Sequence, residues 1–304
     1  MSSSIEVILN AASGVCDTEE VRKLVADSFG PSKIDVNIHV ARDGDEICEI
    51  AQRAVDSDCK IIVVGGGDGT ISCVVAEMIG TDKVLGLLPL GTLNHFAKDL
   101  KIPLTIDEAV RIILAGHSQK VDVGEVNGRI FVNNSSLGLY PDVVRGRERR
   151  ERLGYGKWTS LIRSAFKVLR RHPLIDVRLN VAGDELFIRA PFVFIGNNDY
   201  EMDGFNIGSR SRIDGGHLSL YTTTRTGRLG LFRLAIRALF GRLGQAKDFV
   251  SLTADEVQIE TRRKQLRVAM DGEVAVMQSP LRYCIRPGAL RVIVPSETGN
   301  EELA

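Results

Sequence analysis

Residues 63–72 read VVGGGDGTIS, an apolar run followed by three glycines, an aspartate, a fourth glycine and a threonine. The apolar residues 60–67 predict a buried strand, and residues 71–79 predict a helix. Glycines at the end of a strand let a ligand approach the backbone, and the first turn of a helix offers N–H groups and the positive end of its dipole. The stretch therefore favours an anion such as phosphate, although a plain strand-to-helix turn also explains the glycines.

Two familiar glycine motifs do not fit this stretch. No Gly-Lys-Ser/Thr follows, so it is not a Walker A loop, and Thr70 stands three residues after Gly67 where the dinucleotide fingerprint requires glycine. Asp68 argues for more than a turn, because a carboxylate repels a neighbouring phosphate unless a cation or a ligand hydroxyl lies between them. A magnesium–nucleotide complex supplies such a cation.

The first part of the chain alternates strand and helix patterns. The expected strands are residues 5–10, 34–40, 60–67 and 84–90, and the expected helices are residues 18–29, 46–55 and 71–79. Strands separated by helices of this length predict a parallel sheet covered on both faces. Ligands bind such sheets at the carboxyl ends of the strands, where the polar turns 10–14, 65–70 and 91–95 fall.

The turn at residues 91–95 supports the same site. Gly91 and Thr92 again follow a strand, and Thr92 or Asn94 can cap the helix that continues through Phe96. Capping alone would explain both residues. Two such turns at adjacent strand ends, with a third at Asn10, predict a polar crevice.

After about residue 120 the pattern changes to strands joined by tight turns, among them Asn-Gly, Gly-Asp and Asp-Gly. This pattern predicts an antiparallel, all-β second domain over residues 126–290, interrupted by helices near 156–171 and 227–243. Residues 1–125 then form the α/β domain. The C-terminal tail, residues 290–304, either packs back on the first domain or is disordered.

Composition agrees with a globular protein of two domains. The 304 residues include 39 basic and 39 acidic side chains, so the overall charge predicts no nucleic-acid partner. The N-terminus has no signal-peptide pattern, and no apolar run reaches the roughly 20 residues that span a bilayer. The five cysteines show no paired or metal-binding spacing, so reduced thiols and a cytoplasmic location are expected.

The segment GGGDGT, with NAASG before it and GTLNHFAKDL and VDVGEVNGRIFVNNSSLG after it, resembles the diacylglycerol kinase catalytic family. The resemblance is to the bacterial soluble lipid kinases related to sphingosine and ceramide kinases, and it covers nearly the whole chain. GGDGT is shared with NAD kinases and, more loosely, with phosphofructokinases. The GTLNHFA segment and a later Asp-Gly-Glu are what indicate a lipid kinase.

The resemblance implies a Rossmann-like N-terminal domain and a β-sandwich C-terminal domain, with ATP between them and its phosphates over the GGDGT loop. The residues it implies for the nucleotide site are Asn10, Ser13, Gly14, Gly66, Gly67, Asp68, Gly69, Thr70, Gly91, Thr92 and Asn94. The Asp-Gly-Glu corresponds to residues 271–273. Glu273 is expected to accept the proton of the lipid hydroxyl, while Asp271 and Asp68 help to hold Mg²⁺.

An alternative explanation for Asp271-Gly272 is a hairpin turn between two strands, for which Asp-Gly is a strong signal. Both explanations can hold, because a hairpin tip presents a carboxylate well.

The chain departs from the family at two places. Members often carry Asp-Asp-Gly in the C-terminal domain, where the second aspartate helps to hold a structural magnesium, but this chain has Asp214-Gly215-Gly216. Asp214 either substitutes or the metal site is lost. A threonine common before the Gly-Asp at residues 44–45 is also absent.

The expected partners are a lipid substrate and an anionic membrane surface. Residues 140–172 contain ten Lys or Arg and three acidic residues, which suits peripheral contact with anionic lipid, although a solvated helical face explains them too. Residues 228–244 are amphipathic, and core packing is their simpler explanation. The sequence leaves a homodimer open.

The function expected is therefore an ATP- and Mg²⁺-dependent lipid kinase in phospholipid metabolism, with diacylglycerol as the first candidate substrate and a sphingoid lipid as the second. The alternatives are a NAD kinase, which leaves GTLNHFA and Asp-Gly-Glu unexplained, and a nucleotide- or lipid-binding protein without turnover, which Gly215 motivates.

Overall fold

The computed structural model describes residues 4–12, 18–32, 34–138, 174–181, 184–203, 206–210, 212–223 and 249–296. The chain forms two units, one comprising residues 1–123 and 286–304 and the other residues 124–285. The expected helices at 156–171 and 227–243 and the basic segment 140–172 lie outside the described residues.

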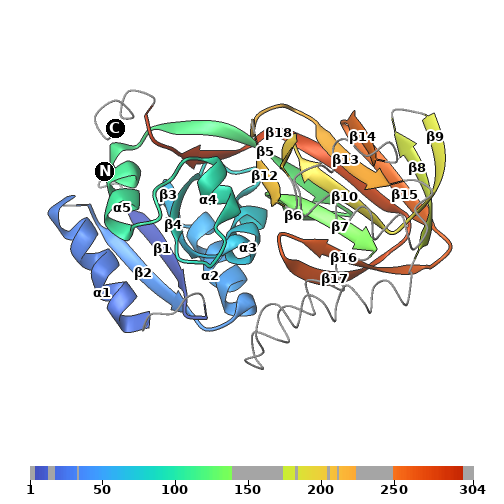
Figure 1. The fold of residues 1–304 in the computed structure, drawn as a ribbon. Coiled ribbons are helices and arrows are strands. Elements are labelled where there is room, and N and C mark those ends of the chain that lie inside the picture. The colour runs from blue at the N-terminus through green and yellow to red at the C-terminus, as the bar shows by residue number, and fades with distance from the viewer. Residues whose placement is uncertain are drawn as a thin grey trace, which may run out of the picture. The chain divides into compact units, whose positions relative to one another are not determined.

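The first unit is built on a parallel sheet (Figure 1). Its strands are β1 (Ile5–Asn10), β2 (Val36–Ala41), β3 (Ile61–Gly66) and β4 (Val84–Pro89), in the order β2-β1-β3-β4. The end of β18 (Leu281–Ile293) adds a fifth strand, because Arg291 and Val292 pair in parallel with β4. The predicted parallel sheet is therefore confirmed.

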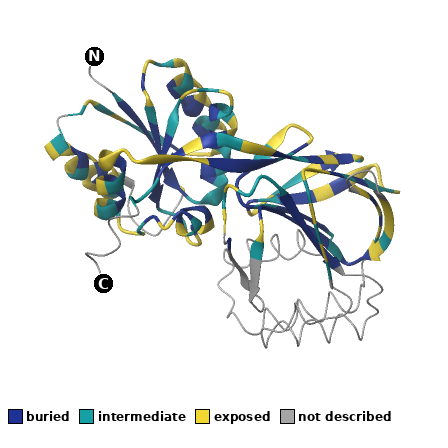
Figure 2. Cartoon of the chain, turned by 90° about the horizontal axis from the view of Figure 1, so that it is seen from above, coloured by how far each residue is buried: buried dark blue, intermediate teal, exposed yellow. Residues whose placement is uncertain are grey.

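Helices cover both faces of this sheet. The elements are α1 (Thr18–Phe29), η1 (Gly30–Ser32), α2 (Gly44–Asp56), α3 (Asp68–Met78), α4 (His95–Asp99) and α5 (Ile106–Ala115). Helix α1 packs with α5, and α2 packs with α3 (Figure 1). The strand side chains between them, such as Val7, Ile8 and Val63, are fully buried (Figure 2). Burial on both faces explains why these strands read as continuous apolar runs.

The second unit is antiparallel. The strands that pass from one unit into the other are β5 (Ser118–Val126) and β18. The remaining strands are β6 (Arg129–Phe131), β7 (Asn134–Gly138), β8 (Ile175–Val181), β9 (Asp184–Ala190), β10 (Phe192–Asn197), β11 (Tyr200–Asp203), β12 (Asn206–Arg210), β13 (Leu218–Thr223), β14 (Phe249–Ala254), β15 (Glu256–Thr261), β16 (Gln265–Met270) and β17 (Glu273–Gln278).

These strands form a sandwich-like domain. One sheet has the order β14-β13-β10-β7-β16-β17, the other contains β18-β15-β8-β9, and β11 pairs with β12 alone. A single apolar core joins side chains of the two larger sheets, including Leu137 and Ile195 from the first and Val257 and Tyr283 from the second. The predicted β-sandwich is confirmed.

Two of the predicted turns form tight hairpins. Asn127 and Gly128 connect β5 to β6 with φ angles of 47° and 83°, and Asp271 and Gly272 connect β16 to β17 with φ angles of 45° and 90°. Positive φ at both turn residues is the conformation that Asn-Gly and Asp-Gly favour in two-residue hairpins.

The expectation of unpaired cysteines is wrong for one pair. Cys48 of α2 and Cys73 of α3 form a disulfide, with a Cα–Cα distance of 6.0 Å. The two residues are 25 positions apart in sequence, and only the packing of α2 on α3 brings them together. Cys59 and Cys284 are not part of a disulfide. No helix among the described residues is long and apolar enough to cross a membrane.

Candidate active site

The GGGDGT segment forms the junction between β3 and α3. Gly67 is the N-cap residue, and α3 begins at Asp68, three residues before the expected start at residue 71. The N–H of Ile71 donates to the carbonyl of Gly67 at 3.0 Å. The N–H groups of the first turn have no acceptor within the helix, and no side chain caps them from Gly67. This helix end suits an anion.

Asp68 joins this turn to the next one. Its Oδ1 accepts the N–H of Phe96 at 3.0 Å, and its Oδ2 accepts the N–H of His95 at 3.2 Å. These are the first N–H groups of α4, so the carboxylate caps a helix in another part of the sequence. The prediction that Thr92 or Asn94 caps α4 is wrong, because Asn94 occupies the N-cap position without a capping side-chain bond.

Asn94 instead holds its own turn. Its Oδ1 accepts the N–H of Gly91 at 2.9 Å, and its Nδ2 donates to the carbonyls of Gly91 at 2.7 Å and Pro89 at 3.1 Å. The residue is buried and has a φ of 50°, a conformation that asparagine tolerates better than most residues. Thr92 lies exposed in the same turn.

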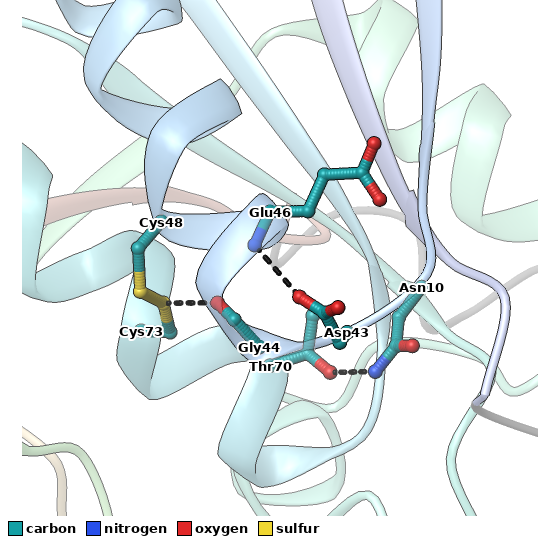
Figure 3. Close-up of a disulfide and its surroundings, with 7 residues drawn as sticks. All are labelled: Asn10, Asp43, Gly44, Glu46, Cys48, Thr70 and Cys73. Carbon is teal, nitrogen blue, oxygen red and sulfur yellow. Dashed lines mark hydrogen bonds between the residues drawn. A yellow bond between two sulfur atoms is a disulfide. The ribbon is translucent and has the colours of Figure 1, made fainter.

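A third turn, at the end of β1, also contacts α3. Asn10 donates from Nδ2 to Thr70 Oγ1 at 2.8 Å (Figure 3). Its Oδ1 accepts the N–H of Ala12 at 2.9 Å. Gly67 and Gly91 touch as well, because a Cβ added to Gly91 would lie 2.4 Å from Gly67 Cα. The turns at residues 10–12, 66–70 and 91–95, called the three-turn site below, are therefore one connected structure.

The three-turn site brings together nine of the eleven residues expected to bind the nucleotide. These are Asn10, Gly66, Gly67, Asp68, Gly69, Thr70, Gly91, Thr92 and Asn94. The other two, Ser13 and Gly14, lie outside the described residues.

The Asp-Gly-Glu segment lies in the second unit, at the tip of the β16–β17 hairpin. The carboxylate of Asp271 accepts three backbone N–H groups, from Val132 at 2.7 Å, Asn133 at 2.8 Å and Asn134 at 3.0 Å. Only 9% of Asp271 is exposed. Three N–H donors stabilise a buried negative charge without a cation. Asp271 thus fixes the hairpin tip against residues 132–134.

Residues 132 and 133 also contact Arg210, a buried cationic side chain. Arg210 donates from Nη1 to the carbonyl of Val132 at 2.7 Å and from Nη2 to Asn133 Oδ1 at 3.1 Å. Asn197 Nδ2 donates to the same Val132 carbonyl at 2.9 Å. The peptides of residues 132–134 therefore lie between the charges of Asp271 and Arg210. Sequence reasoning missed Arg210, because nothing distinguishes it from its surface neighbours in RSRID.

Glu273 differs from Asp271 in every respect that matters for proton transfer. It is exposed and pairs in register with Met270 at the start of β17. Its side chain makes no hydrogen bond to any of the described residues. Its carboxylate is therefore available to a substrate.

The turn at Asp214, considered above for a structural magnesium ion, makes contacts within the protein. Arg212 Nε donates to Asp214 Oδ1 at 3.2 Å. A Cβ at Gly215 would lie 2.7 Å from Asn198 Oδ1, a buried oxygen without a hydrogen-bond partner. The described residues contain no group of three or more His, Cys, Asp or Glu side chains arranged to hold a metal ion.

Next to this turn, Asp199 accepts from Ser219 Oγ at 2.5 Å and lies 3.0 Å from Nε2 of His217. Burial raises the pKa of Asp199, but the hydrogen bonds from Ser219 and His217 and the His217 charge outweigh it, so the pKa is lowered.

The fold and these turns define a protein with an α/β nucleotide-binding type of domain and a β-sandwich. Residues 4–126 match the diacylglycerol kinase catalytic domain, and residues 147–294 match the YegS C-terminal NAD kinase beta sandwich-like domain. Together these two matches cover most of the chain and assign it to the diacylglycerol kinase catalytic domain family, with a C-terminal domain similar to that of YegS.

Individual relatives agree with this assignment. The diacylglycerol kinase of Staphylococcus carnosus (strain TM300) is 28% identical over 263 residues, which cover 86% of this chain and 84% of the relative. That of Staphylococcus aureus (strain bovine RF122 / ET3-1) is 28% identical over 264 residues, 86% of this chain and 82% of the relative.

Solved structures share the fold. The crystal structure of a diacylglycerol kinase from Bacillus anthracis str. Sterne aligns with a TM-score of 0.72 at 20% identity, covering 96% of this chain and 97% of that chain. A second structure from the same organism aligns with a TM-score of 0.78 at 23% identity, with the same coverage.

Gly91→Ala tests the contact between two of the turns. The new methyl group would collide with Gly67 Cα, which is backbone and cannot move aside cheaply, so the free energy of unfolding should fall by about 1–3 kcal/mol. Gly44→Ala is the matched control, because its Cβ meets nothing within 4 Å. Urea denaturation of both variants measures the difference, and a Gly91→Ala protein as stable as the control would contradict the contact.

Asp68→Asn tests the cap on α4. Asparagine keeps one acceptor oxygen but turns an amide toward the second N–H, so stability should fall by about 1–2 kcal/mol. The amides of His95 and Phe96 should exchange faster with solvent, which NMR hydrogen exchange measures. The control is Asp58→Asn on the exposed surface. Unchanged exchange at His95 and Phe96 would show that the carboxylate does not cap α4.

Asp271→Asn tests the acceptor of residues 132–134. The variant loses the charge and faces an amide toward N–H donors, so stability should fall by about 1–3 kcal/mol. Faster amide exchange at residues 132–134 should accompany the loss, while exposed Asp255→Asn leaves both unchanged. The network is refuted if those three amides keep their protection in Asp271→Asn.

Proposed function

We propose that the protein is an ATP- and Mg²⁺-dependent lipid kinase that transfers the γ-phosphate to a lipid hydroxyl, with diacylglycerol as the first substrate and a sphingoid lipid as the second. The observation that carries the proposal is the three-turn site, in which three polar turns converge on the first turn of α3. Membership of the diacylglycerol kinase catalytic domain family supports it.

In this proposal residues 1–125 form the nucleotide-binding domain, and the tail from about residue 290 packs back on that domain. The phosphates interact with the N–H groups at the start of α3, where glycines at 66, 67 and 69 leave the backbone accessible. Gly91 allows the neighbouring turn to approach Gly67, and Asn10 positions Thr70. These residues bind and orient the nucleotide phosphates, and none of them transfers a proton.

The residues present fit a magnesium ion brought in with the nucleotide. Mg²⁺ is usually held by one or two carboxylates together with substrate phosphates and water, so a group of three protein ligands is not required. A carboxylate has about four acceptor positions, and the two backbone N–H bonds of Asp68 do not prevent it from binding a cation. When bound, the ion neutralises charge on the transferred phosphoryl group. Asp68 would hold it, with Asp271 as a second candidate ligand.

Residues 126–290 bind the lipid and supply the base. Glu273 accepts the proton of the attacking hydroxyl, because it is the carboxylate of the Asp-Gly-Glu segment that is exposed. Asp271 fixes the turn that carries it through the N–H groups of residues 132–134.

The cellular setting is part of the same proposal. A lipid kinase meets its substrate at a membrane, so we propose a cytoplasmic protein in peripheral contact with anionic lipid through the basic segment 140–172, acting in phospholipid biosynthesis. A homodimer is compatible with this setting. A structural magnesium at Asp214 is the weakest of these assignments, since Arg212 already pairs with that carboxylate.

Glu273→Gln tests the base. Loss of general-base catalysis should lower kcat by about 10²–10⁴-fold, while KM for ATP and the unfolding midpoint stay unchanged because the side chain is exposed. The assay is transfer of radiolabelled γ-phosphate from ATP to diacylglycerol, sphingosine and NAD. Glu256→Gln, at an exposed strand position, is the matched control.

The outcomes separate the candidates. Transfer to a lipid that Glu273→Gln abolishes supports the proposal. Transfer to NAD favours a NAD kinase, and no transfer to any acceptor favours a binding protein without turnover. Full activity in Glu273→Gln would remove Glu273 from the mechanism.

A further inference from the structure

The disulfide between Cys48 and Cys73 lies close in the chain to the three-turn site. Cys73 follows Thr70 by three residues, almost one helical turn along α3. Thr70 accepts the hydrogen bond from Asn10, and Asp68 at the start of the same helix caps α4. Figure 3 shows the sulfur bridge and the Asn10–Thr70 bond attached to the same helix. A covalent link at Cys73 therefore acts on the element that organises the site.

The partner residue is on a well-anchored helix. Cys48 lies in α2, which begins after the N-cap residue Asp43, whose Oδ1 accepts the N–H of Glu46 at 3.0 Å (Figure 3). Glu46 Oε2 in turn accepts the N–H of Arg42 at 2.7 Å. The start of α2 is thus fixed by reciprocal capping bonds.

Neither helix needs the bond in order to fold. Ile47, Ile50 and Ala51 of α2 and Val74 and Val75 of α3 are buried, so apolar packing holds the two helices. The reduced thiol of Cys73 also has an acceptor, since its Sγ lies 3.9 Å from the carbonyl oxygen of Gly44. The reduced and oxidised forms are therefore both compatible with the fold.

The pair is open to small reagents. Cys48 and Cys73 are half-buried, whereas Cys59 is buried and Cys284 belongs to the second unit. A Cα–Cα distance of 6.0 Å is within the usual range for two bridged cysteines, so the packing of α2 on α3 already places the two residues close enough to pair. In reducing compartments such bonds are usually transient and redox-sensing.

We propose that Cys48 and Cys73 form a reversible thiol–disulfide site that links α2 to α3 and steadies the three-turn site, with a hydroperoxide as the oxidant. One thiolate attacks a peroxide oxygen, giving a sulfenic acid and, after protonation, one water from hydrogen peroxide. The second thiol attacks the sulfenic sulfur, which forms the S–S bond and releases a second water. The two sulfurs lose two electrons, the peroxide gains two, and both thiol protons end in water. A dithiol reductant reverses the reaction.

Two consequences follow from the link. It removes conformational freedom from the unfolded chain, which stabilises the first unit. It also restrains α3, so the site needs less ordering when a ligand binds. The first consequence is independent of the proposed kinase function, and the second rests on it.

The first experiment uses the full chain treated with hydrogen peroxide or with dithiothreitol. Mass spectrometry after alkylation should find Cys48 and Cys73 joined in the oxidised protein and alkylated in the reduced one. The thermal unfolding midpoint should be about 5–10 °C higher in the oxidised form. Cys48→Ser and Cys73→Ser should each abolish that difference, and Cys284→Ser should retain it. Two alkylated thiols after oxidation, or a difference that survives in Cys48→Ser, would overturn the proposal.

The second experiment measures ATP binding to both forms by calorimetry. The oxidised wild-type protein should bind ATP severalfold more tightly than the reduced protein, and Cys48→Ser should show one affinity under both conditions. Equal affinities in the two wild-type forms would overturn the coupling between the bond and the three-turn site. If neither form binds ATP, the proposed nucleotide function fails as well as that coupling, while the joined cysteines and the midpoint difference still establish the thiol site.

Discussion

The hydrogen bonds from His95 and Phe96 to Asp68 are the constraint on which the first unit's site depends. One carboxylate begins α3 and caps α4, so the two helix starts cannot move independently. The turns that carry Gly67 and Gly91 also lie close together, and a Cβ at Gly91 would be only 2.4 Å from Gly67 Cα. Glycine at position 91 is therefore needed for the contact between the two turns.

In the second unit, too, one aspartate accepts backbone N–H groups from a distant part of the chain. Asp271 accepts three N–H groups from residues 132–134, and Arg210 donates to a carbonyl of the same segment. Both aspartates singled out for chemistry thus also organise backbone, and their charge is balanced by N–H dipoles in the protein itself. Of the three carboxylates Asp68, Asp271 and Glu273, only the exposed Glu273 does not hold a backbone segment in place, which is why the proposal gives it the proton transfer.

The fold was predictable because it depends on local patterns: apolar runs separated by helices, and Asn-Gly or Asp-Gly between strands. The sequence indicated that the three turns lie near one another, but it did not predict the hydrogen bonds that connect them. The capping of α4 by Asp68 joins residues 27 and 28 positions apart, and propensity favoured the adjacent Asn94 instead. The Cys48–Cys73 pair and the burial of Arg210 likewise result from packing between distant elements, which composition and spacing do not show.

Gly215 is the departure from the family pattern that suggested a protein without turnover. The contacts around this position explain why it is a glycine. A side chain there would collide with Asn198 Oδ1, and an aspartate would place its negative charge beside that buried oxygen. The adjoining residues already interact, because His217 Nε2 lies 3.0 Å from Asp199 Oδ2. The substitution is therefore part of a different local packing arrangement in the second unit.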